Sequence, residues 1–354
     1  MTTLLLEPHK VTKESRLMKK NLIALAVAGA IAAPAAAMAD ATVYGQVHLS
    51  YGAVDSEELG VTVDDNIQLR SHASRIGVKG SEDLGSGLAA NYGLEWGINP
   101  DSNNNTGWSR RNQWIGLAGG FGEVRFGRHD TPLKMAQGKF DQFNDMDGDM
   151  LKTFAGEDRS DNTVTYLNNF GAFGVAVTLI PGEGDGTSTG DSFADSWSAA
   201  VTYTAGPLFL SGAYTAYDDE SGFGSGSSAF DGVAGTTVTG VEDIFRLVAT
   251  YNWNQHAFGL AYGQESNTVS ALDVMSVGAS WKMGLGGGNA VRAQWTYAEM
   301  DDMNLERTVM DLGFDHAFSK KTSVYAVYHT EETEFGNTTV EEMDFIGVGM
   351  LMKF

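Results

Sequence analysis

One short pattern recurs along most of this chain and limits the folds open to it. Segments of roughly ten residues alternate apolar residues with small or polar ones, and each is followed by a turn or a polar loop. Examples are TVYGQVHLSYG, DVMSVGASWKM and the last residues, FIGVGMLMKF. We count about sixteen such segments between Asp40 and Phe354. Because successive side chains of a strand point to opposite faces, each segment predicts a strand with one apolar face.

The links between these segments indicate a membrane-spanning barrel. Short links such as TAGP, NQ and SKK alternate with long acidic or glycine-rich ones such as SEELGVTVDD and PGEGDGTSTGD. Tight turns at one end and long loops at the other are typical of outer-membrane barrels, and a soluble sandwich does not need them. A closed barrel is also the only strand structure that satisfies its backbone within hydrocarbon. We therefore predict an all-β fold for residues 40–354, a transmembrane antiparallel barrel whose last strand pairs with its first.

The first 39 residues are predicted to be an N-terminal extension and a signal peptide. Two lysines precede the apolar run NLIALAVAGAIAAPAAAMA, which ends on small residues, so cleavage is expected before Asp40. Met18 is the expected start, since the basic region begins there. A transmembrane anchor is the alternative, and the short run interrupted by Pro34 disfavours it. After Asp40 no run of about eighteen apolar residues occurs, which argues against a helical membrane protein.

Charge and composition exclude several functions. Residues 1–39 hold five of the 23 basic and two of the 45 acidic residues, so the remainder has a net charge of −25 and should repel nucleic acid. The chain has no cysteine, and its seven histidines lack the spacing of metal ligands. No serine lies in a Gly-x-Ser-x-Gly elbow. We expect no enzyme activity, no cofactor and no metal site, although external carboxylates could bridge divalent cations loosely.

Two adjacent stretches carry a family resemblance. SRIGVKGSEDLGSGLAANYGLEWG, from Ser74, and RRNQWIGLAGGFGEVRFGRHDTP, from Arg110, resemble the general porins of Gram-negative outer membranes. The resemblance extends from about residue 40 to Phe354. It implies a sixteen-stranded homotrimeric barrel in the outer membrane, in contact with lipid and lipopolysaccharide. Phe354 resembles the terminal signal that the barrel assembly machinery reads.

The same resemblance implies a pore constriction, with an external loop at about residues 130–160 folded inward. Facing rows of opposite charge would place a transverse field across the pore. The sequence lacks the PEFGG loop tip of enterobacterial porins, so the aspartates that enter the pore stay open. Arg110 competes with one of the wall positions, and Arg128 is a candidate for the subunit interface. The basic wall positions implied are Arg75, Arg111 and Arg159, and the acidic loop candidates are Asp141, Asp145, Asp147 and Asp149.

Strand parity gives an independent indication of the lumen. In RIGVKG, Ile76 and Val78 suit lipid, which turns Arg75 and Lys79 inward, and the same parity turns Glu95 inward. An arginine or lysine on the lipid face costs about 2–4 kcal/mol at the membrane centre. Parity therefore adds Lys79 and Glu95 to the expected lumen residues.

Three functions are compatible with these features of the sequence. We favour a passive diffusion channel for small hydrophilic solutes and ions, with weak cation selectivity expected from the acidic loops. The alternatives are an adhesion or receptor barrel with a plugged lumen and a secreted soluble enzyme. The stretch DMDGDM also resembles part of a calcium loop around Gly148, but it lacks the closing glutamate.

Overall fold

The computed structural model describes residues 41–101, 107–181, 194–217, 228–230, 233 and 240–354. The predicted signal peptide and Met18 lie outside these residues. No helix among the described residues is long and apolar enough to cross a membrane. The strands are β1 (Thr42–Glu58), β2 (Val61–Ser71), β3 (Arg75–Gly85), β4 (Leu88–Ile98), β5 (Trp108–Gly119), β6 (Gly122–Asp130), β7 (Arg159–Phe170), β8 (Phe173–Ile180), β9 (Ser196–Ala205), β10 (Leu208–Ala216), β11 (Val241–Trp253), β12 (His256–Asn267), β13 (Val274–Gly286), β14 (Asn289–Met300), β15 (Leu305–Ala317), β16 (Thr322–Phe335) and β17 (Thr338–Lys353). The short helices are α2 (Pro132–Met135), η1 (Met150–Lys152), η3 (Ser270–Leu272) and η4 (Asp301–Met303).

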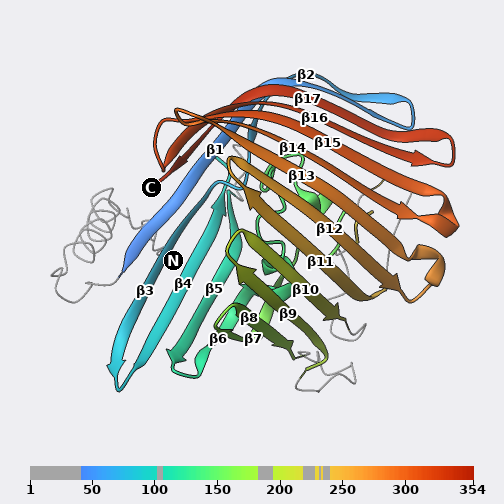
Figure 1. The fold of residues 1–354 in the computed structure, drawn as a ribbon. Coiled ribbons are helices and arrows are strands. Elements are labelled where there is room, and N and C mark those ends of the chain that lie inside the picture. The colour runs from blue at the N-terminus through green and yellow to red at the C-terminus, as the bar shows by residue number, and fades with distance from the viewer. Residues whose placement is uncertain (1–40, 102–106, 182–193, 218–227, 231–232, 234–239) are drawn as a thin grey trace, which may run out of the picture. The chain divides into compact units, whose positions relative to one another are not determined.

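Antiparallel pairing closes these strands into a barrel (Figure 1). β1 pairs with β17 from Gln46 opposite Lys353 to Glu58 opposite Glu341. On its other edge β1 pairs with β3 near its start and with β2 further along. β2 and β3 therefore form one wall strand that breaks at His72–Ser74, where Ala73 has a φ of 45°. Counted in this way the barrel has sixteen strands, which confirms the predicted fold.

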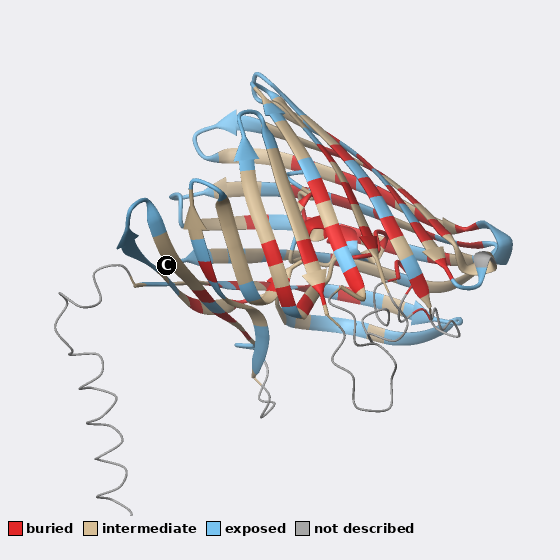
Figure 2. Cartoon of the chain, turned by 90° about the horizontal axis from the view of Figure 1, so that it is seen from below, coloured by how far each residue is buried: buried red, intermediate tan, exposed pale blue. Residues whose placement is uncertain are grey.

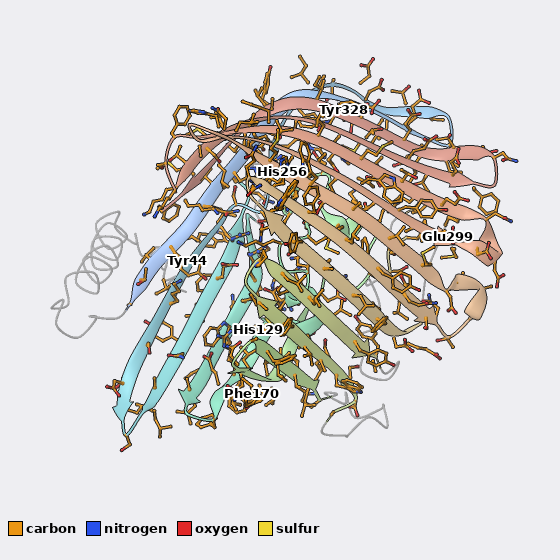
Figure 3. The ribbon with its side chains drawn as sticks, viewed as in Figure 1. Tyr44, His129, Phe170, His256, Glu299 and Tyr328 are labelled. Atoms are coloured by element: carbon orange, nitrogen blue, oxygen red, sulfur yellow. The ribbon has the colours of Figure 1, made fainter. Side chains whose placement is uncertain are left out.

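The two faces of the strands alternate as the sequence predicts (Figure 2). On β1, Val43 and Tyr51 are 59% and 56% exposed, whereas Gln46, His48 and Ser50 are buried. Exposed rings such as Phe170 and Tyr328 belong to the outward set (Figure 3). Every second side chain at the chain's end is apolar and exposed, namely Ile346, Val348, Met350, Met352 and Phe354. The outer face is apolar and the inner face is mostly polar.

The chain's last residue joins the ends of the barrel. The Phe354 N–H donates to the Gly45 carbonyl at 3.1 Å, and the Gly45 N–H donates back to the Phe354 carbonyl at 3.3 Å. A Cβ at Gly45 would lie 2.5 Å from the Phe354 ring, so glycine is required for this close approach. The terminal strand is thereby hydrogen-bonded to the first strand up to its last residue.

Candidate functional site

The segment between β6 and β7, residues 131–158, lies inside the barrel and is called the inner loop below. Its carbonyl groups are held by side chains of the wall. Ser211 on β10 donates to the Ala136 carbonyl at 2.6 Å, and Arg307 on β15 donates to the Lys152 carbonyl at 3.1 Å. Gln294 on β14 donates to the Gly148 carbonyl at 3.0 Å. The inner loop is thus fixed against one side of the wall, over β10 to β15.

Aromatic side chains of the inner loop pack against glycines of that wall. Phe140, Phe143 and Phe154 are almost completely buried. A Cβ at Gly278 would lie 2.6 Å from the Phe140 ring, and a Cβ at Gly263 would lie 3.0 Å from the Phe154 ring. The wall therefore leaves space for the loop's rings where it lacks side chains. Because close-packed contacts of this kind resist displacement, the loop has one defined position.

Two of the four candidate aspartates bind the loop's own backbone. Asp141 accepts hydrogen bonds from the N–H groups of Phe143 at 2.8 Å and Met150 at 3.0 Å. Asp149 accepts from Asp145 N–H at 2.8 Å and caps η1 by accepting from Leu151 N–H at 3.0 Å. The Asp141–Met150 bond joins the two arms of the loop. These two carboxylates hold the loop's shape and do not form a row facing the pore.

Burial gives the loop a pH dependence. It raises the pKa of Asp141 to about 6, against the opposing effect of the hydrogen bonds from Met150 and Phe143. Burial also raises the pKa of Asp149, and the nearby charges of Asp141 and Glu157 add to this shift. A carboxyl group whose pKa is higher in the docked loop than in the free loop stabilises the docked loop. This stabilisation is complete when the pH is below the ordinary pKa of 3.8. That contribution is lost as the pH rises through about 6.

We expect the inner loop to loosen between pH 4 and pH 7. Hydrogen–deuterium exchange of peptides covering residues 141–150, corrected for intrinsic rates, should be faster at pH 7 than at pH 5. Asp141→Asn, which resembles the protonated acid, should reduce this difference in exchange rate. Part of the difference should remain, because Asp149 still titrates in the variant. An unchanged pH dependence in that variant would contradict the assignment to Asp141.

The other two candidate aspartates contact the wall at β2 and β3. Asp145 lies 2.8 Å from Nη1 of Arg75 at the start of β3, and Asp147 lies 2.9 Å from Nη2 of Arg70 at the end of β2. Strand parity could have indicated Arg70, because the apolar neighbours Ile67 and Leu69 face outward on the same strand. The loop tip is therefore bound to the wall at β2 and β3 by two ion pairs.

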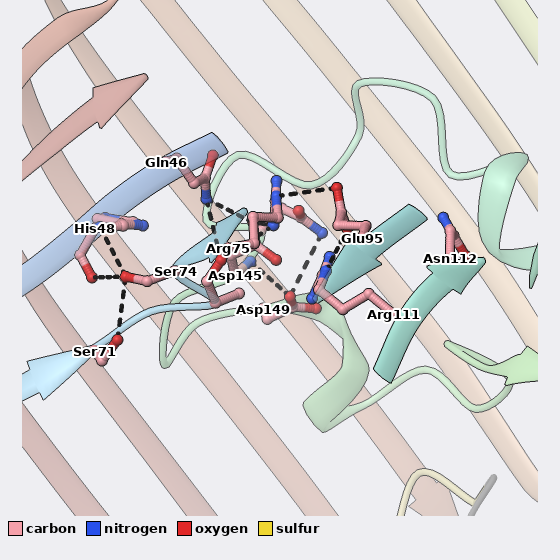
Figure 4. A network of polar contacts seen from close by, with 12 residues as sticks. Gln46, His48, Ser71, Ser74, Arg75, Glu95, Arg111, Asn112, Asp145 and Asp149 are labelled. Atoms are coloured by element: carbon pink, nitrogen blue, oxygen red, sulfur yellow. Dashed lines mark hydrogen bonds and ion pairs between the residues drawn. The ribbon is translucent and has the colours of Figure 1, made fainter. Parts of the chain in front are cut away.

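Four charged side chains form a continuous row at this point (Figure 4). The two oxygens of Glu95 face different arginines: Oε1 is 2.5 Å from Nε of Arg111, and Oε2 is 3.9 Å from Nε of Arg75. Arg75 in turn contacts Asp145. The structure thus brings together four of the predicted residues, which alternate in sign as Asp145, Arg75, Glu95 and Arg111.

The remaining wall residues lie beside this row. Arg159 pairs with Asp130 at 2.8 Å and donates to Oδ1 of Asn112 at 3.0 Å, and Asn112 donates to Asp130 at 2.6 Å. Lys79 is exposed, with its Nζ 5.1 Å from the centre of the Tyr44 ring. Asp130 and Asn112 were not predicted, because ion pairing across strands depends on register that the sequence does not show.

Arg110 and Arg128 face the outside of the barrel. A bulge shifts the β4–β5 register after Leu94, so that Arg110 lies opposite the outward Trp96. Arg128 follows the exposed Phe126 by two residues and shares its face. Their guanidinium groups lie 3.5 and 2.9 Å from the same Asp161 carboxylate. Arg111 is therefore the inward member of the pair that the sequence left open.

The family model for Gram-negative porins matches residues 24–336. The chain belongs to the Gram-negative porin family. Outer membrane porin protein 32 of Delftia acidovorans is 30% identical to this porin in an alignment of length 331, which covers 87% of this chain and 88% of the relative. Major outer membrane protein P.IB of Neisseria gonorrhoeae is 43% identical over 121 residues, 33% of the chain and 34% of that relative.

Solved structures share the fold of this porin. An anion-selective porin from Comamonas acidovorans superposes with a TM-score of 0.72 at 22% identity, covering 89% of this chain and 99% of that one. The trimer form of OmpT from Vibrio cholerae gives a TM-score of 0.64 at 18% identity, with the same two coverages. At these identities the likeness concerns the fold alone.

Membership of the porin family establishes the cellular location of this protein and the class of protein to which it belongs. This porin is a protein of the Gram-negative outer membrane, it is not an enzyme, and it needs no cofactor. The aspartates of the suggested calcium loop have other partners: Asp145 and Asp147 pair with arginines, and Asp149 caps a helix. Within the described part of the chain, no three His, Asp or Glu side chains are arranged to hold a metal ion.

Proposed function

We propose that this porin is a passive diffusion channel for small hydrophilic solutes and ions, with the inner loop as its constriction. The row from Asp145 to Arg111 carries this proposal, because it places charges of both signs on the loop tip and on the inner face of β3 to β5. The side chains of Arg75 and Arg111 are 22% and 19% exposed although they point inward, so water reaches them. The width of the lumen would then exclude large solutes, and its charged side chains would sort the smaller solutes by charge.

Conductance in a planar bilayer tests the proposal. A channel should give steady ohmic steps, and neutral sugars of graded size should reduce them up to a limiting size. The alternative, an adhesion or receptor barrel with a plugged lumen, would give no steady conductance.

We further propose weak cation selectivity, set at the external mouth. A cavity of about 510 Å³ opens there, and its lining includes eight acidic and two basic residues. Such an excess of negative charge concentrates cations before they reach the constriction. The anion-selective porin from Comamonas acidovorans has the same fold, so the fold is compatible with the opposite preference. Reversal potentials in a potassium chloride gradient decide between them, and an anion preference would contradict the proposal.

A homotrimer is proposed from the charges on the outer face. Arg110, Arg128 and Asp161 lie on a face whose neighbouring side chains, such as Phe126 and Ile115, are apolar and exposed. An arginine facing hydrocarbon costs about 2–4 kcal/mol. Coverage of this patch by a second copy of the chain removes that cost.

We expect Arg128→Glu to weaken the trimer, because it places a second negative charge beside Asp161 and removes the 2.9 Å ion pair. Native mass or light scattering in detergent should show a larger monomer fraction. Lys320→Glu, the same charge reversal at an exposed turn, is the control and should stay trimeric. A trimer of normal stability in Arg128→Glu would refute this assignment of the interface.

Two further partners are proposed from the outer surface. Asp55 on β1 lies opposite both Asp65 on β2 and Asp344 on β17, so like charges adjoin across three strands. Divalent cations that bridge these carboxylates to lipopolysaccharide phosphates would relieve the repulsion. The outward ring of Phe354, which is 45% exposed, is accessible to the barrel assembly machinery.

A further inference from the structure

Glu95 occupies an isolated position on the inner face of β4. Its neighbours on that face, Gly93 and Gly97, carry no side chains. Side chains of β5 use the space they leave: a Cβ at Gly93 would lie 3.0 Å from Trp114, and one at Gly97 would lie 3.7 Å from Cδ of Arg111. Glu95 is thus the one charged side chain on this stretch of β4, and an arginine approaches it from each neighbouring strand.

The other acidic groups near the constriction are committed elsewhere. Asp141 and Asp149 bind backbone N–H groups of the inner loop. Asp147 pairs with Arg70, and Asp130 pairs with Arg159. Among the described residues, Glu95 is the carboxylate that Arg75 and Arg111 share. Its removal would leave the row with one negative and two positive charges.

We propose that Glu95 is a specificity-determining residue at the constriction: its carboxylate keeps the constriction electrically balanced, and its loss makes the channel prefer anions. This inference rests on the proposed function of the protein as a channel. It adds a wall residue to the loop aspartates as a determinant of selectivity at the constriction. The balance is local, because Glu95 is only 8% exposed and screening by salt is weak for buried charges.

Electrostatics predicts the direction and the size of the change. A passing ion meets the guanidinium groups of Arg75 and Arg111, which are partly exposed to the lumen. Without Glu95 these groups repel cations and attract anions. One unbalanced charge a few ångströms from the ion path should change the cation-to-anion permeability ratio by about threefold to tenfold.

The test compares charge-matched variants in planar bilayers under a potassium chloride gradient. Glu95→Gln should shift the permeability ratio toward chloride, and Glu95→Asp, which keeps the charge, should stay near the wild type. Glu123→Gln is the matched control, since Glu123 is an inward acid that pairs with one arginine, Arg125, at 2.8 Å. The double variant Glu95→Gln with Arg111→Gln should restore the wild-type ratio, because it removes one charge of each sign.

Two outcomes would overturn the inference: an unchanged ratio in Glu95→Gln with normal conductance, or an equal shift in Glu123→Gln. A wild-type protein without conductance would instead defeat the proposed channel function, so the two failures are distinguishable. If Glu95→Gln does not fold, as judged by the loss of the mobility shift that heating causes in a denaturing gel, the Arg111→Gln variant alone still tests the proposal. That variant must shift the ratio toward potassium, and the absence of such a shift contradicts the proposal.

Discussion

Leu260→Arg is expected to destabilise the barrel by about 2–4 kcal/mol. Leu260 is 64% exposed on the outer face of β12, between Ala249 and Ala279 of the neighbouring strands. At this position an arginine cannot reach water in the lumen, because its side chain points away from it. Its charge would have to be solvated within hydrocarbon or drawn toward the headgroups. The free energy of unfolding in urea, measured in lipid vesicles, should fall by this amount.

Thr202→Arg is the matched control for that substitution. Thr202 on β9 faces inward and lines a cavity of about 260 Å³, so an arginine there has space and water. Its unfolding free energy should stay within about 0.5 kcal/mol of the wild type. Equal destabilisation by the two substitutions would show that the outer face of β12 does not face lipid.

Most of the barrel could be predicted because parity along a strand is a local property. The apolar residues of the last strand, from Ile346 to Phe354, identify its outer face without any tertiary information. The same parity placed Arg75 and Glu95 on the inner face, where the structure has them. One face of each strand meets hydrocarbon and the other meets water. A charged side chain on the wrong face would therefore destabilise the barrel.

Parity fails where the backbone departs from regular pairing. The bulge between β4 and β5 shifts the register, so that Arg110 lies opposite the outward Trp96 and Arg111 points inward. Alternation along β5 alone could not say which of the two arginines points inward. The break at His72–Ser74 likewise divides one wall strand into β2 and β3. Both irregularities depend on contacts between strands, and such contacts leave no periodic signal in one sequence.

The inner loop was the least predictable part of the site. A row of aspartates suggested an acidic face, yet Asp141 and Asp149 accept hydrogen bonds from the loop's backbone. For Asp149 a local signal existed, because aspartate is a preferred N-cap and Met150–Lys152 forms a helical turn. For Asp141 none existed, since its partner Met150 lies nine residues away and is brought close only when the loop folds.

The Asp141–Met150 bond also permits a sharp test of the constriction. Because this bond closes the loop's two arms at 3.0 Å, residues 142–149 form a sub-loop that two glycines can replace, while Ser211 and Arg307 still hold the arms at Ala136 and Lys152. The replacement removes Asp145 and Asp147 from Arg75 and Arg70 and takes the loop tip out of the lumen.

Single-channel conductance of this shortened porin should rise roughly twofold, and larger neutral sugars should enter, because the narrowest section of the lumen is widened. The reversal potential should move toward chloride, since two arginines lose their carboxylate partners while Glu95 remains. Asn144→Ala, a change at the exposed loop tip, is the control and should leave both quantities unaltered. If the shortened protein kept the wild-type conductance and sugar cutoff, the narrowest section of the pore would have to lie away from the inner loop. The row from Asp145 to Arg111 would then be a structural contact of the wall, without a role in selecting solutes.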